Sequence, residues 1–496
     1  MPSQTAQERG VVAAAVLASA MAFLDATALN VALPAIQKDM QLSGSTFLWL
    51  VNGYLLTLGA LILACGALGD KLGHARVLAA GIVTFMVGSC ACGLAPNAAV
   101  LLSARVLQGV GGALLIPAGP ALLAAVFGAE REGQAIGTWS AATTLVTVAG
   151  PAVGGGLAQL GLWRVIFLLN APLAIAALVI LKRAAPSPKR REGRIDVAGA
   201  LLGAIALFCV TCVAMTAPER GLDGLMIALA LGGAAALVAF ALVELRGRAP
   251  MLPPRLFRIP AFVGANLLTL FLYGALSALM FFLSLNLVQI QGYPPVQAGL
   301  AFLPLSLLLM ALSRRMGRHA DAHGPRRLLI LGPALVSAAM ALLALPGVDA
   351  GSYWLTYFPG LCLFGLGMAL TVAPLTTTAI KSVPAEQSGV ASGVNNATAR
   401  VAGVLATAAL GGLGLYLFRR SVEANAPPGW REALVREAHK LGAAKLPEGA
   451  PPLIFKQAFV SMFRVVALCC AGLAALASVS AAVFVRGGEP RKQGQV

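Results

Sequence analysis

The chain has 496 residues, of which 58% are hydrophobic and 11% charged, and its mean hydropathy is +0.84. This composition is that of a polytopic membrane protein, and it leaves no room for a soluble domain of useful size. The formal net charge of +17 would suit a nucleic-acid partner, but the basic residues are dispersed in short segments between apolar runs. Because that pattern is a topology signal, we expect no nucleic-acid partner.

Fourteen apolar runs in the sequence are long enough to cross a membrane as helices. Six runs lie in residues 1–181, two in residues 182–258 together with basic linkers, and six in residues 259–496. The sequence therefore predicts an all-α polytopic membrane protein with two six-helix bundles and two inserted transmembrane helices. The predicted spans are 11–34, 46–68, 76–95, 99–126, 134–160, 163–181, 196–217, 223–245, 260–290, 296–313, 326–346, 353–375, 387–417 and 456–485.

The distribution of Lys and Arg predicts how these spans are oriented. With the N-terminus inside, 23 of the 36 basic residues fall at inner termini and inner loops, against three in the short outer loops. We therefore expect a multi-pass protein of the cell (inner or plasma) membrane with both termini cytoplasmic. The outer loop at 418–455 disagrees, because it carries six basic residues. There the helical spacing of Trp430, Leu434 and Leu441 predicts a short amphipathic helix at the outer surface.

Asp25 lies deep in the first predicted span, where an ionisable side chain is costly and usually functional. It is the only one of the 19 acidic residues that we place deep in a span, and none of the four histidines lies in one. If the protein moves protons, Asp25 is the expected carrier. The alternative is a buried acid that only hydrogen-bonds a neighbouring helix.

Arg105, in the fourth predicted span, lies at a depth similar to that of Asp25, about two turns below the outer end. An arginine within reach would keep Asp25 ionised, and a competing cation or a change of hydration would let Asp25 take up a proton. The alternative is that the Arg105 side chain extends outward to the membrane interface.

Two pairs of inner-loop segments repeat at nearly the same spacing along the chain. Residues 66–78 align with residues 317–329 at an offset of 251, and residues 129–137 align with residues 385–393 at an offset of 256. Because both pairs have the same orientation, they predict parallel repeats about an axis along the membrane normal. The candidate loop residues of the first pair are Gly66, Asp70, Gly73 and Arg76 in one half, with Asp321, Gly324 and Arg327 in the other.

Five motifs occur in chain order: LDATALNVALP (24–34), GALGDKLGHAR (66–76), RVLQGVGGA (105–113), GPAVGGGL (150–157) and WRVIFLLNAP (163–172). Together they resemble the major facilitator superfamily, and within it the fourteen-span drug:proton antiporter branch, over essentially the whole chain. The resemblance implies the fold of that superfamily, a gating role for the loop residues above, and an antiporter motif at Gly150, Pro151, Gly154 and Gly155. Our candidate residues for a substrate cavity are Asn30, Gln108, Asn396 and Arg400.

These patterns favour a secondary transporter that exports hydrophobic or cationic small molecules in exchange for protons. The sequence contains no Walker-type phosphate loop, zinc-type His cluster or nucleophile elbow. We therefore expect no enzymatic activity, no catalytic residue, no metal, and no cofactor, with protons as the coupling ion. The expected partners are a small-molecule substrate and membrane lipid. The alternatives are a metabolite uptake symporter and a non-transporting membrane sensor of the same fold.

Overall fold

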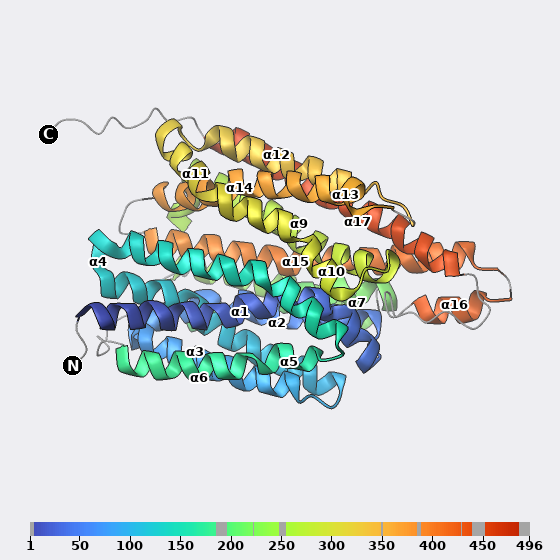
Figure 1. Ribbon diagram of the computed structural model, residues 1–496, viewed down its shortest axis with the longest axis horizontal. Coiled ribbons are helices and arrows are strands. Elements are labelled where there is room, and N and C mark those ends of the chain that lie inside the picture. The colour runs from blue at the N-terminus through green and yellow to red at the C-terminus, as the bar shows by residue number, and fades with distance from the viewer. Residues whose placement is uncertain are drawn as a thin grey trace. The chain divides into compact units, whose positions relative to one another are not determined.

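The computed structural model describes residues 4–184, 196–221, 223–247, 254–348, 351–383, 388–427, 429–438 and 452–485. Within these ranges the chain forms helices and no strand (Figure 1). Eleven of the helices are long and apolar enough to cross a membrane, and three shorter apolar segments lie at Thr46–Ile62, Leu145–Gln159 and Ala198–Ala214. The predicted all-helical polytopic class is confirmed, whereas the count of fourteen spans stays a prediction.

The chain divides into two compact units. The first comprises Met1–Met251, Leu287–Leu300 and Arg436–Lys445, and the second comprises Leu252–Asn286, Ala301–Val435 and Leu446–Val496. The helices of the first are α1 (Gln4–Met40), α2 (Gly44–Leu72), α3 (His74–Gly93), α4 (Ala98–Gln159), α5 (Trp163–Leu168), α6 (Asn170–Ala184), α7 (Val197–Arg220) and α8 (Gly224–Arg246), with most of the π-helical η2 (Asn286–Ile290) and α10 (Pro295–Ala301).

The second unit begins with the 3-10 helix η1 (Pro254–Arg258). Its α-helices are α9 (Pro260–Leu285), α11 (Leu303–His323), α12 (Arg326–Leu343), α13 (Tyr353–Thr356), α14 (Phe358–Lys381), α15 (Ser388–Asn425), the first part of α16 (Arg431–Ala438) and α17 (Pro452–Phe484). Every predicted span falls largely on one of these helices or on two consecutive ones.

Helix α4 is assigned without a break over 62 residues, where the sequence predicted the two spans 99–126 and 134–160 with a loop between them. The segment between the two predicted spans is thus helical as well. The intervening stretch at 128–133 holds Ala, Glu and Arg between two glycines and contains no proline. Because Ala, Glu and Arg are good helix formers, helical backbone continues through it.

The contacts of α4 with α1 nevertheless show that α4 reverses direction. Gly119 lies beside Ser19, and twenty residues later Trp139 donates a hydrogen bond to the same Ser19 over 3.0 Å. Farther along, Gly154 lies against Ala28, so the chain has returned along α1. The two predicted spans are therefore the two legs of α4, lying antiparallel to each other along α1.

Single glycines make the sharp turns that the sequence repeat predicted. Gly73 joins α2 to α3 with φ 95°, and Gly324 follows α11 with φ 86°. A residue with a side chain is strained at such positive φ values, so glycine is required at both turns. The two halves of the chain thus share this turn at aligned positions.

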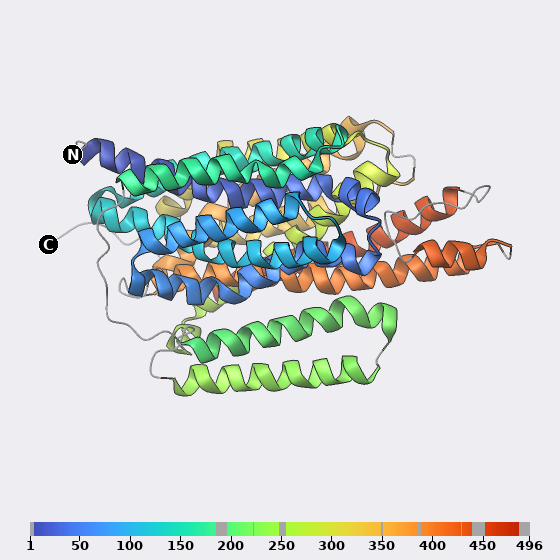
Figure 2. The ribbon, with the colours of Figure 1, turned by 90° about the horizontal axis from the view of Figure 1, so that it is seen from below.

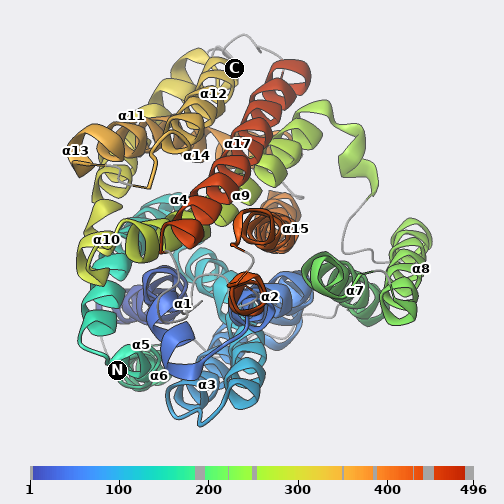
Figure 3. The same cartoon turned by 90° about the vertical axis from the view of Figure 1, so that its right-hand side faces the viewer.

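Helices α7 and α8 form a hairpin in the first unit (Figure 2). Its helices begin at Asp196 and Asp223, whose carboxylates accept hydrogen bonds from the amides of Gly199 (2.7 Å) and Met226 (2.8 Å). Figure 3 shows α7 between α2 and α8. The rings of Trp49 on α2 and Phe208 on α7 lie 6.1 Å apart. The hairpin therefore packs on the first unit through α7.

A regular ladder of hydrogen bonds joins α12 and α17 in the second unit. Successive bonds are four or seven residues apart along α12, and they are equally far apart in the opposite direction along α17. The donor side chain belongs to α12 and to α17 alternately. The bonds run from Arg326 to the carbonyl of Ala482 (3.0 Å), from Ser478 to Ile330 (2.8 Å), from Ser337 to Ala471 (2.8 Å) and from Arg464 to Ala344 (3.3 Å). Such bonds are effective between membrane helices, where no water competes for the carbonyls.

The loop predicted at 418–455 is largely helical where the structure describes it. Helix α15 continues to Asn425, and α16 is the short helix that the spacing predicted. The side chain of Leu434 has no solvent exposure, so it is buried in the protein and does not lie on a lipid surface as expected. Leu441 lies outside the described residues.

Candidate functional site

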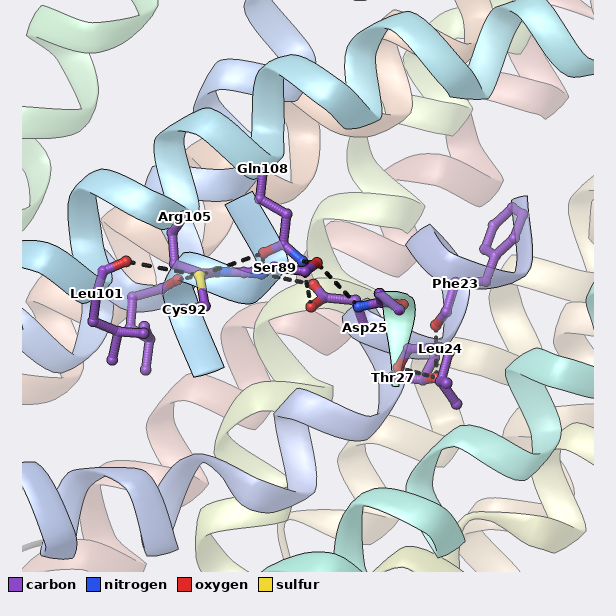
Figure 4. A network of polar contacts seen from close by, with 11 residues as sticks. Phe23, Leu24, Asp25, Thr27, Ser89, Cys92, Leu101, Arg105 and Gln108 are labelled. Atoms are coloured by element: carbon purple, nitrogen blue, oxygen red, sulfur yellow. Dashed lines mark hydrogen bonds and ion pairs between the residues drawn. The ribbon is translucent and has the colours of Figure 1, made fainter. Parts of the chain in front are cut away.

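Asp25 lies on α1 and is paired with an arginine in the interior of the first unit (Figure 4). Asp25 has no solvent exposure and Arg105 on α4 has 1%. Arg105 Nη1 lies 2.6 Å from Asp25 Oδ2, so the two side chains form a salt bridge. Pairing cancels their net charge, which is how membrane interiors accommodate ionised groups. The structure thus brings together the two residues that the sequence placed at one depth.

The guanidinium of Arg105 is held by further groups from α2 and α4. Its Nε donates to the backbone carbonyl of Leu50 over 3.2 Å, and its Cζ lies 4.4 Å from the centre of the Tyr54 ring. Its Nη1 also donates to Oε1 of Gln108. Arg105 therefore points into the unit and does not extend to the outer interface.

The hydrogen bonds of Gln108 determine which way its amide points. Oε1 accepts from Arg105, and Nε2 donates to Asp25 Oδ1 over 2.8 Å. With the amide reversed, an NH₂ group would face the guanidinium, and two donors cannot bond. We expected Gln108 in a substrate cavity, but it has no solvent exposure and bridges the acid and the base. The reason is its position three residues after Arg105, which puts both on one face of α4.

The network continues through Ser89 on α3 to Asn170 at the start of α6. Gln108 Nε2 donates to Ser89 Oγ over 2.7 Å, and Asn170 Nδ2 donates to the same Oγ over 3.1 Å. Both residues are fully buried, and Asn170 Oδ1 has no hydrogen-bond partner among the described residues. Because both neighbouring groups are amide donors, Ser89 Oγ accepts both bonds.

Sequence reasoning missed Ser89 and Asn170. A weak signal was present, because Asn170 belongs to the motif WRVIFLLNAP and Ser89 is a polar residue within the third predicted span. Both residues are small and uncharged, so neither stood out as Asp25 did.

Glycines let the helices that carry this network approach closely. A Cβ at Gly88 on α3 would lie 2.7 Å from the backbone nitrogen of Gln108, and one at Gly109 would lie 2.7 Å from the carbonyl of Tyr54. Neither distance is possible for a real side chain. The glycines of the motif RVLQGVGGA and their neighbour on α3 thus bring α2, α3 and α4 to backbone contact around Arg105.

The predicted antiporter motif lies on the second leg of α4, against the part of α1 that follows Asp25. A Cβ at Gly150 would collide with Thr27 Oγ1, and one at Gly154 would collide with the carbonyl of Ala28. Gly155 and Pro151 instead approach the backbone of α10, at Pro295 and Gly299, within the first unit. Gly156 has no neighbour within 4 Å.

The other predicted residues that the structure describes make no hydrogen bond to the Asp25 network in either unit. Asn30 is half-buried on α1, five residues after Asp25. Asn396 is exposed on α15 and donates to the carbonyl of Ser392 over 3.0 Å, and Arg400 on the same helix is half-buried. Of the loop residues, Arg76 and Arg327 are exposed and Gly66 has open space around it, whereas the side chains of Asp70 and Asp321 lie outside the described residues.

A second polar cluster, which lacks any charged group, joins α9 and α15. Asn395 Nδ2 donates to Thr269 Oγ1 over 2.7 Å and to Asn266 Oδ1 over 3.4 Å, and Thr398 donates to Asn266 Oδ1 over 3.3 Å. Among the described residues no group of three or more metal-ligating side chains occurs. The Asp25 network is a buried ion pair on which a chemical role can be built.

The sequence of the chain matches a family model and several known proteins. The model for the Major Facilitator Superfamily matches residues 15–407. The chain is 34% identical over 497 residues to the tetracenomycin C resistance and export protein of Streptomyces glaucescens, covering 95% of this chain and 90% of that protein. It is 35% identical over 402 residues to a puromycin resistance protein of Streptomyces alboniger, covering 79% of each chain.

The fold also matches solved transporter structures. A bacterial homologue of the human lysosomal transporter Spinster superposes with a TM-score of 0.70 at 16% identity, covering 97% of this chain and 98% of that one. A D-xylose–proton symporter superposes with a TM-score of 0.61 at 14% identity, covering 96% and 98%. With the family match over most of its length, the chain belongs to the Major Facilitator Superfamily.

Proposed function

We propose that the protein is a proton-coupled exporter of hydrophobic small molecules, working by antiport in the cell membrane. The observation that carries this proposal is the fully buried Asp25–Arg105 salt bridge with its bridging Gln108. An ionised acid is retained inside a membrane protein at a cost, and proton relays are one of the recurring reasons. The similarity to resistance and export proteins supports export as the direction.

Protonation of Asp25 would disrupt this network at whichever oxygen receives the proton. At Oδ2 the new O–H would face the Arg105 donor, and at Oδ1 it would face the Gln108 donor. If Gln108 turned its amide to accept from Oδ1–H, its NH₂ would then face Arg105. One contact is lost in every case, so a single proton changes how α1 is held to α4. This is the kind of two-state element that alternating access requires.

The membrane arrangement that we propose has fourteen spans with both termini in the cytoplasm. The three shorter apolar segments would complete the eleven longer helices, one each on α2, on the second leg of α4 and on α7. The charge distribution supports the orientation. Protons serve as the coupling ion with no other cofactor, the partners are the exported molecule and membrane lipid, and the protein is a transporter without enzymatic activity.

The test is transport by the purified protein in proteoliposomes with an imposed pH gradient. Puromycin and tetracenomycin C are the first substrates to try, because similar proteins are named for resistance to them. Antiport predicts that substrate accumulates on the acidic side and that its addition moves protons the other way. Accumulation on the alkaline side would indicate the alternative, an uptake symporter. A complete absence of coupled flux for a substrate that binds would favour a sensor.

A further inference from the structure

Arg400 is distinguished by its depth within α15. It lies twelve residues after Ser388, so it is about 18 Å along the helix axis from the first residue of α15, and Asn425 lies farther away still. A side chain at this depth cannot bring its charge to the membrane interface. A lipid-facing position would leave the guanidinium in hydrocarbon, so an arginine here is expected to face protein or a water-filled path.

The second unit provides no carboxylate to pair with Arg400. None of the spans predicted after residue 259 contains Asp or Glu, and the next acid along α15 is Glu423, about 35 Å away. Asp25 of the first unit is already bonded to Arg105. The guanidinium of Arg400 makes no hydrogen bond or salt bridge with another described residue, and its electrostatic neighbour is the phenol of Tyr273 on α9. Among the described residues no carboxylate therefore compensates its positive charge.

Arg400 belongs to a polar stripe on α15. Asn396, Arg400, Gly403 and Thr407 follow one another at steps of four, three and four residues, which places them on one helix face. Asn396 is exposed, Arg400 is half-buried, and Thr407 is 1% exposed with no hydrogen-bond partner for its Oγ1 among the described residues. The stripe thus offers several polar atoms that the fold leaves unused.

This stripe borders α9, because Gly403 lies against Ser277 and the charge of Arg400 acts on Tyr273, but its side chains are not those that hydrogen-bond to α9 among the described residues. The side chains of Asn395 and Thr398 are already hydrogen-bonded to Asn266 and Thr269 on α9. Arg400 lies five residues after Asn395, and that step turns the side chain by about 140° around the helix. Hydrogen bonding to α9 therefore accounts for Asn395 but not for Arg400.

From these placements we propose that Arg400, with Asn396 one turn away, binds the cargo and selects hydrophobic molecules that carry an anionic oxygen, such as a carboxylate or an ionised phenol or enol. The inference rests on the proposed transport function and adds the charge of the cargo to it. A guanidinium donates two parallel hydrogen bonds to the two oxygens of a carboxylate and also bonds the single oxygen of an ionised phenol or enol. The Asn396 amide adds a donor on the same face of α15. The same charge repels cationic cargo, which the sequence analysis had included.

Binding of fluorescent probes to the purified full-length protein tests this proposal. The probes are dichlorofluorescein, an anion at neutral pH, and ethidium, a cation of similar size. We expect the wild type to prefer dichlorofluorescein. Arg400→Gln should lower that affinity at least tenfold while leaving ethidium binding unchanged or stronger, and Arg400→Lys, which keeps the charge but loses the paired donors, should have an intermediate effect.

The matched control is Arg464→Gln, which removes an arginine of α17 whose Nε is bonded to the carbonyl of Ala344. It should change stability without changing the preference between the two dyes. A wild type that does not bind dichlorofluorescein, or an equal loss of both dyes in Arg400→Gln, would overturn the proposal. Failure of the proposed transport function can be told apart from failure of the Arg400 proposal. In that case the protein would still bind the two dyes selectively, but a proton gradient would drive no dye flux.

Discussion

Trp139 and Asn395 make equivalent hydrogen bonds in the two halves of the chain. Trp139 on α4 bonds to Ser19 on α1, and Asn395 on α15 bonds to Thr269 on α9. Trp139 and Asn395 are 256 residues apart, which is the offset of the loop repeat just before them, and Ser19 and Thr269 are 250 apart. The repeat thus extends from the loops to a polar contact within each unit, although the residue types have changed.

Removing either hydrogen bond should lower the stability of the protein by a similar amount. We expect Trp139→Phe and Asn395→Leu each to lower the free energy of unfolding by about 0.5 to 1.5 kcal/mol, the range for hydrogen bonds between membrane helices. Equilibrium unfolding in mixed micelles measures this. Thr211→Val on α7 is the control, because its hydroxyl bonds only within its own helix. A loss confined to one of the two variants would show that the contacts are not equivalent.

Asp25→Asn should abolish proton-coupled transport and leave the fold intact. Asparagine has the same shape and can still accept from Arg105, but it cannot take up or release a proton at physiological pH. The measurement is proton movement on substrate addition to proteoliposomes. The control is Asp39→Asn at the other end of the same helix, whose carboxylate is half exposed and bonded to Arg164 at 2.8 Å. Wild-type coupling in Asp25→Asn would refute the assignment.

Arg105→Ala should move the pH dependence of transport to the alkaline side. Without the guanidinium, the buried carboxylate loses its counter-charge and its neutral form is favoured. Flux should therefore fail at neutral pH and partly recover as the pH rises. An efflux-against-pH curve of unchanged shape would show that the salt bridge does not control the proton.

Gln108→Met should also move the pH dependence of transport to the alkaline side, but by less than Arg105→Ala does. Methionine fills similar space and removes one donor to Asp25 while leaving the salt bridge in place. A hydrogen bond to a charged group contributes about 1.5 to 3 kcal/mol, against about 3 to 5 kcal/mol for breaking a buried ion pair, so the effect should be the smaller one. A lower rate at every pH, with the curve unmoved, would mean that Gln108 only supports packing.

Gly154→Ala should strongly reduce transport, because a Cβ there would meet the backbone of Ala28, with the Cα at 2.6 Å. The second leg of α4 would have to move away from α1 just beyond Asp25. Gly156→Ala is the matched control in the same motif, since it would meet nothing within 4 Å. We expect at least a tenfold loss of efflux rate for the first and less than a twofold change for the second. Equal rates for both variants would show that this close approach has no function.

The helices could be predicted because they depend on the length of the apolar runs. The Asp25–Arg105 pair could be predicted because the depth of a residue in the membrane can be counted from the ends of its span. The sequence predicted Gly73 and Gly324 as turns because a glycine that recurs at aligned positions of two polar loops indicates backbone that only glycine adopts easily. It could not predict that Gln108 and Ser89 would join Asp25. Which uncharged residues meet depends on how each helix is rotated about its axis, and this is determined by packing at glycines such as Gly88.

The same limit explains the continuous assignment of α4. Loop residues with high helix propensity look alike whether the chain runs on or reverses, and only the contacts of Gly119 and Trp139 with Ser19 reveal the reversal. Leu434 is a similar case, because an apolar helix face has the same spacing whether it meets lipid or protein.

The ladder between α12 and α17 has a practical consequence for spectroscopy. Because donors alternate between the two helices over four rungs, neither helix can slide or roll without breaking bonds that lipid cannot replace. A pair of spin labels with one on each of these helices should keep a constant, narrow distance distribution throughout the transport cycle. Labels on this pair therefore provide an internal reference frame from which displacements of α9 and α15 can be measured.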